Sequence, residues 1–81
     1  MDIENLVKMA NDIGSFFNSE PDHTAAVAGV YDHIRKFWDP RMRSAVIQHL
    51  GQGGEGLGEL AREAIAKLSV ESKSLCQVGD G

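Results

Sequence analysis

The sequence has one cysteine, Cys76, among its 81 residues. A single thiol excludes an internal disulfide framework and a cysteine-rich metal site. No apolar run approaches the roughly 18 residues that a membrane-spanning helix requires. The N-terminus, residues 1–4, is acidic and lacks the basic region and the apolar stretch of a signal peptide. We therefore expect a cytoplasmic protein from a reducing compartment.

The chain is also short, and this excludes a two-domain enzyme with an enclosed cofactor cavity. A domain of this size buries only about 60% of the surface that its unfolded chain exposes, so its core is small. The composition, 42% hydrophobic and 25% charged, is that of an ordinary globular protein. We expect one small domain, and a subunit that gains stability from a partner stays possible.

Charge is unevenly spread along the chain. The net charge of −4 argues against nucleic-acid binding, which needs a concentrated positive field. Residues 1–32 carry six acidic side chains against one basic, and residues 44–81 carry five against three. Residues 33–43, which we call the basic segment, carry four basic side chains against one acidic, a balance of +3. Such a run is either a solvated helix face or a place where a partner binds.

Apolar residues recur at helical intervals, and the alternation typical of strands is absent. The intervals predict four helices, over about residues 3–18, 22–38, 40–50 and 57–68. We therefore predict an all-α fold, a small bundle of three to four short helices. Residues 1–68 would form a single domain, and residues 69–81, which lose the periodicity, a frayed and flexible tail.

Individual residues mark the ends of these helices. Asp2 and Asp39 stand where an N-cap carboxylate is expected, and Pro40 suits the first turn of a helix. Gly51 is expected to end the third helix in a left-handed conformation. The glycine-rich residues 51–58 then predict a flexible connection, because the lysine and hydroxyl residue of a phosphate-binding loop are missing.

The first two predicted helices differ in the width of their apolar face. The second carries a face of about 120°, the width of one buried side, which we expect to form core. The members of this face are Val27, Val30, Tyr31, Ile34, Phe37 and Trp38. In the first helix, Met9 and Phe16 widen the apolar surface to about 180°. Either this helix packs between two neighbours, or Met9 and Phe16 belong to a partner-binding patch.

The sequence offers no recognisable catalytic or metal-binding pattern. The histidines, His23, His33 and His49, are separated by 10 and 16 residues, so no two of them have the i, i+3 or i, i+4 spacing that brings imidazoles together on a helix. Cys76 falls in the predicted tail, outside any expected pocket with a base. We expect no catalytic, cofactor-binding or metal-binding residue in this chain.

The basic segment places cations around a tryptophan at a predicted helix corner. Arg and Trp are among the residue types most enriched at binding hot spots. The predicted partner-docking residues are Arg35, Lys36, Trp38, Arg41 and Arg43, with Met9 and Phe16 as a second patch.

Three stretches form specific motifs. They are residues 6–11 (LVKMAN) followed by Ile13 and Phe17, residues 33–43 (HIRKFWDPRMR), and residues 53–57 (GGEGL). In this order, over roughly residues 5–68, they resemble the small delta subunits of soluble NAD-dependent formate dehydrogenases. The run KFWDPRMR at residues 36–43 is the most specific part of the resemblance.

The resemblance implies a non-catalytic accessory subunit that binds the large catalytic subunit and stabilises its assembly or assists its maturation. The complex would interconvert formate and carbon dioxide with NAD, and its larger subunits would carry a molybdenum or tungsten pterin, iron–sulfur clusters and FMN. This chain would bind none of these cofactors, and neither nucleic acid nor membrane. The competing hypothesis, which rests on the apolar surface of the first helix, is a free-standing helical adaptor or a self-associating protein with an unrelated partner.

Overall fold

The structure is a computed structural model that describes residues 2–80, with side chains up to Glu71. It consists of four helices: α1 (Ile3–Phe17), α2 (His23–Phe37), α3 (Pro40–Gly51) and α4 (Glu59–Asp80). Residues 2–80 contain no strand. The predicted all-α fold is confirmed, and α1, α2 and α3 begin and end within one residue of their predicted bounds.

Aspartates begin the first three helices. Asp2, Asp22 and Asp39 each accept a backbone N–H of the first helical turn, at 3.0 or 3.1 Å. These N–H groups have no partner inside the helix, so the carboxylate satisfies them. The caps predicted at Asp2 and Asp39 are confirmed. Because Pro40 starts α3 directly after Asp39, the connection between α2 and α3 is a tight corner that contains Trp38.

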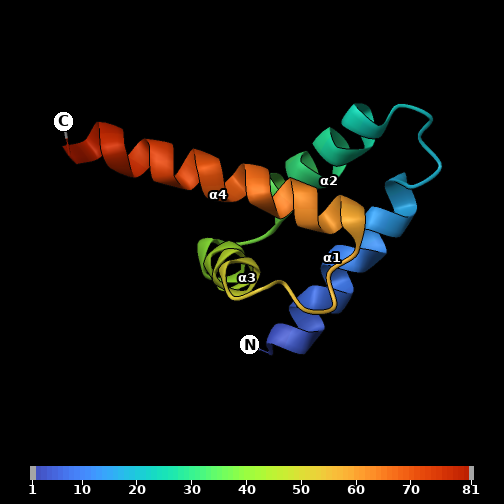
Figure 1. Cartoon of the computed structure of the whole chain (residues 1–81), viewed down its shortest axis with the longest axis horizontal. Coiled ribbons are helices and arrows are strands. Elements are labelled where there is room, and N and C mark those ends of the chain that lie inside the picture. Colours follow the sequence, from blue (N-terminus) through green and yellow to red (C-terminus); the bar gives the residue numbers. More distant parts are fainter. Residues whose placement is uncertain (1, 81) are drawn as a thin grey trace.

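α4 lies across the other three helices and packs against each of them (Figure 1). α1 also contacts all three of its neighbours, and Met9 packs against the core, whereas Phe16 stays 76% exposed. Among the described residues, no polar or charged side chain is buried. The buried core consists of Leu6, Ala10, Ala26, Val27, Val30, Ile34, Trp38, Val46, Leu57, Ala61, Ala64, Ile65 and Leu68.

The core face predicted for α2 is wrong at one residue, Phe37, which is 73% exposed. Phe37 lies at the edge of that face, and the next residue, Trp38, takes the place in the core with 5% exposure. The Phe37 ring contacts His33 instead, with 4.8 Å between the ring centroids. Spacing gives the width of an apolar face, but the neighbouring helices decide which edge of it they cover.

The predicted end of α3 is also corrected. Gly51 is the last helical residue, and the left-handed position falls on Gly53, with φ +119°. The N–H of Gly53 donates to Leu50 O, and the N–H of Gly54 donates to His49 O. These two bonds form a Schellman motif, in which the left-handed glycine stands two residues after the last helical one.

α4 is longer than predicted. Its backbone runs from Glu59 to Asp80, whereas the periodicity indicated an end near residue 68. No proline follows residue 68, and the first glycine is Gly79, so the backbone stays helical where the apolar pattern stops. The C-terminal end of the α4 ribbon extends past the other helices (Figure 1). None of the described helices, α4 included, is long and apolar enough to cross a membrane.

Side chains from three helices hold the loop between α3 and α4. Asn11 of α1 donates to Gly56 O at 2.8 Å and accepts from Gly58 N at 2.7 Å. Arg62 of α4 and His49 of α3 donate to three further carbonyls of the loop, at 2.8 to 3.1 Å. The loop that was expected to be a flexible connection is therefore fastened at several points.

Replacing Asn11 with Ala removes both hydrogen bonds to the loop. We expect the free energy of unfolding to fall by about 1–2 kcal/mol, because each bond contributes roughly 0.5–1.5 kcal/mol. The measurement is urea unfolding followed by circular dichroism. The matched control is Asn5→Ala, since among the described residues the Asn5 amide donates only to Met9 Sδ, at 3.7 Å. Equal stability of the two variants would contradict the role of Asn11.

Candidate functional site

The basic segment occupies the corner where α2 ends and α3 begins. Arg35 and Lys36 are exposed on the last turn of α2. Arg41 is exposed on the first turn of α3, and Arg43 is half-buried. Lys36 pairs with Asp32 one turn earlier at 3.0 Å, and exposed pairs of this kind hold their partners weakly. The corner therefore presents positive charge to solvent on an otherwise acidic protein.

Trp38 and Met9 lie deeper than the other residues predicted to dock. Trp38 is a core residue at the corner, and its backbone N–H donates to Ile34 O. Met9 is half-buried and packs against the core. Both side chains therefore support the surface from inside and offer little area to a partner.

Two phenylalanines stand out from the surface, Phe16 at 76% and Phe37 at 73% exposure. Phe17 turns inward, because Gly29 of α2 leaves room for its ring: a Cβ there would lie 2.5 Å from the ring. An apolar hollow of about 290 Å³ adjoins Phe16. Its wall is formed by Asp12, Ile13, Phe16, Phe17 and His33. Phe37 was not among the predicted docking residues, because its spacing placed it in the core.

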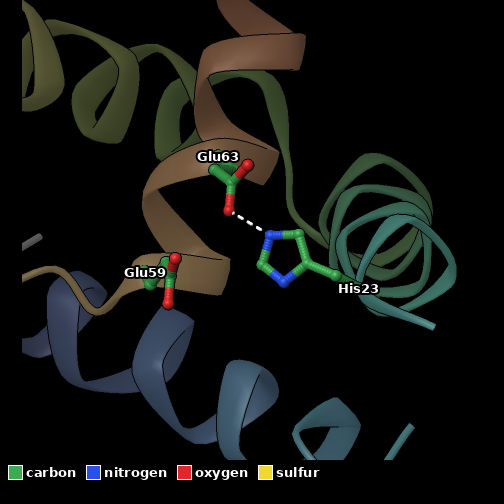
Figure 2. A group of neighbouring side chains, drawn as sticks. All are labelled: His23, Glu59 and Glu63. Carbon is green, nitrogen blue, oxygen red and sulfur yellow. Dashed lines mark hydrogen bonds and ion pairs between the residues drawn. The ribbon is translucent and has the colours of Figure 1, made fainter. Parts of the chain in front are cut away.

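His23, Glu59 and Glu63 form a cluster of potential metal ligands (Figure 2). His23 comes from the start of α2, and the two glutamates come from the first turns of α4. One ligand atom from each residue lies within 4.8 Å of the others, and all three side chains are exposed. His23 Nε2 and Glu63 Oε2 are 2.5 Å apart and form an ion pair between the helices when the imidazole is protonated.

An imidazole and two carboxylates are donors that divalent transition metals accept, so these three residues could hold such a cation. The spacing of the histidines does not indicate this cluster, because its two carboxylates lie 36 and 40 residues after His23 in the chain. Glu59 and Glu63 stand four residues apart, the spacing that places two side chains on one helix face. That signal was available, but only the packing of α2 against α4 brings His23 to them.

A family model matches residues 5–65, which is most of the chain. Its description is the delta subunit of NADH-dependent formate dehydrogenase, FdsD. The chain belongs to this family. The match runs from α1 into α4 and includes the basic segment and the fastened loop of the delta subunit. No curated protein and no solved structure matches the chain.

The resemblance that the motifs indicated is thus confirmed. As a delta subunit of a formate dehydrogenase, the chain has other formate dehydrogenase subunits as its partners. The basic corner, the two exposed phenylalanines and the cluster of potential ligands all lie on the surface of this subunit.

Replacing Glu63 with Gln removes the charge that faces His23 and keeps the shape of the side chain. Both side chains are about half exposed, so we expect the delta subunit to lose no more than about 1 kcal/mol of unfolding free energy. The loss should shrink in about 1 M salt, where screening acts over about 3 Å. Urea unfolding at low and high salt measures it.

The control is Glu55→Gln, which removes an equal charge from an exposed loop side chain that forms no ion pair among the described residues. If Glu63→Gln lowers the unfolding free energy equally at low and high salt, or if the control lowers it as much, the contact with His23 does not cause the loss.

Proposed function

We propose that this delta subunit is a non-catalytic accessory subunit of a NAD-dependent formate dehydrogenase. It binds the large catalytic subunit and stabilises its assembly or assists its maturation. The observation that carries the proposal is the exposure of Phe16 and Phe37, at 76% and 73%, on a member of this family. Burial of large apolar side chains against a partner lowers the free energy of the complex, and exposed patches of such side chains mark interfaces.

We place the cofactors of the complex, a molybdenum or tungsten pterin, iron–sulfur clusters and FMN, in its larger subunits. The donors of this chain do not fit an iron–sulfur cluster, because such clusters are held by several cysteine thiolates and the chain has one cysteine. We therefore assign no catalytic step to the delta subunit. The cytoplasmic location expected from the sequence belongs to the same proposal.

The main docking surface in this proposal is the basic corner with Phe37. Arg35, Lys36 and Arg41 are exposed and attract an acidic surface of the partner, which speeds association and sets orientation. Phe37 lies among them in the chain and offers an apolar side chain for a pocket of the partner. Charge around an apolar anchor is the usual arrangement of a subunit interface.

Phe16 is proposed as a second contact. It lies next to the apolar hollow between α1 and α2, into which a side chain of the partner can insert. Met9 and Trp38 are more buried and support both surfaces from inside.

Co-expression of the tagged delta subunit with the other formate dehydrogenase subunits tests the proposal. We expect the large catalytic subunit to co-purify, and less assembled complex to accumulate when the delta subunit is omitted. Purification of the delta subunit without any formate dehydrogenase subunit would contradict it. Sedimentation of a stable homo-oligomer in that case would favour the alternative, a self-associating protein whose exposed phenylalanines cover one another.

Arg41→Glu reverses the charge of the corner and should leave the fold intact, because an acid is favourable in the first turn of α3. We expect about tenfold less catalytic subunit to co-purify, because the reversed charge repels an acidic partner surface. Lys8→Glu, an equal reversal at an exposed position of α1, is the control and should have little effect. If Arg41→Glu has no effect and Phe16→Ser abolishes co-purification, the interface lies on α1 instead.

A further inference from the structure

A charged hollow opens at the corner where α2, α3 and α4 meet, with a volume of about 270 Å³. Ile47 and Leu68 supply an apolar part of its wall. Arg35 from α2 and Arg43 from α3 add two cations. Glu71 of α4 is the only carboxylate among the described residues that line it. The hollow therefore carries an excess of positive charge beside an apolar surface.

Arg43 has hydrogen-bonding capacity that the fold leaves unused. Its Nε is buried and has no hydrogen-bond partner among the described residues. Buried donors are nearly always paired in native structures, so an unpaired one in the wall of a hollow points to a missing acceptor. The arginine fork matches the two oxygens of a carboxylate better than any other acceptor group in proteins.

Arg35 is held only loosely by its partner. Its Nε lies 3.6 Å from Glu71 Oε1, within reach of an ion pair but too far for a hydrogen bond. The Arg35 and Glu71 side chains are 52% and 38% exposed, so solvent screens their attraction. A second carboxylate that enters the hollow can displace Glu71 from Arg35 without breaking a strong contact.

We propose that the charged hollow receives an acidic side chain from another formate dehydrogenase subunit. The carboxylate of that side chain binds the Arg43 guanidinium and replaces Glu71 at Arg35, while its methylene groups lie against Ile47 and Leu68. Glu71 acts as an internal competitor that occupies Arg35 when the delta subunit is alone. This inference rests on the proposed function, which supplies the partner, and on the charge complementarity of two cations to one incoming carboxylate.

The test uses isothermal titration calorimetry. It compares the dissociation constants with which the delta subunit and its variants bind the catalytic subunit that co-purifies with it. Arg43→Gln removes the charged fork, and we expect binding to weaken about tenfold or more. Arg43→Lys keeps the charge without the fork and should restore only part of the affinity. Lys8→Gln, which removes an exposed charge on α1, should bind like the unaltered subunit.

Glu71→Gln is expected to strengthen binding to the catalytic subunit, the opposite of the effect of Arg43→Gln. Removing the internal competitor should tighten binding about two- to fivefold, because Arg35 is then available to the partner from the start. In the Arg35→Gln background the same change at Glu71 should have no effect, since there is no cation left to release. Circular dichroism and thermal unfolding of each variant show that the helices and their packing are retained.

The outcomes separate this inference from the proposed function. Failure of the unaltered delta subunit to bind the catalytic subunit would overturn both. Binding that Arg43→Gln and Arg43→Lys leave unchanged would overturn only the assignment of the hollow. Weaker binding by Glu71→Gln would also overturn it, because Glu71 would then contact a cation of the partner.

Discussion

The position of α4 depends on the hydrogen bonds that fasten the loop before it. Asn11, His49 and Arg62 come from α1, α3 and α4 and all reach the backbone of this one loop. The contacts therefore form together only when these three helices are in place. Apolar burial has no direction of its own, so in a small core directed polar contacts decide which packing is adopted.

α4 packs against both α2 and α3, the two helices that meet at the corner. Trp38 fills the core at that corner, and the chain turns at once into α3 through the Asp39 cap. Burying Trp38 leaves Phe37 in solvent, next to the cations that surround it in the sequence. Trp38, which is buried at the corner, and Phe37, which is exposed to a partner, are thus adjacent in the chain.

The same packing explains why the local charge of residues 33–43 indicates a docking surface better than the net charge of the whole chain does. The acidic residues lie on several helices, whereas four cations are concentrated at the end of α2 and the start of α3. α4 adds Leu68 to the apolar wall of the charged hollow there, and Glu71, the only carboxylate among the described residues that line it. For a delta subunit, a basic corner with a hollow and exposed aromatic rings matches an acidic surface of a partner subunit.

The sequence by itself determined the helical fold, the caps at Asp2 and Asp39, and the family, because caps, periodicity and motifs are local patterns of neighbouring residues. Two predictions from the sequence are wrong: that Phe37 is buried in the core, and that Gly51 is the left-handed glycine at the end of α3. Only the tertiary structure decided that Phe37 is exposed, that His23 meets Glu63, and that the loop is fastened rather than flexible. Each of these depends on contacts between residues far apart in the chain, which local spacing does not encode.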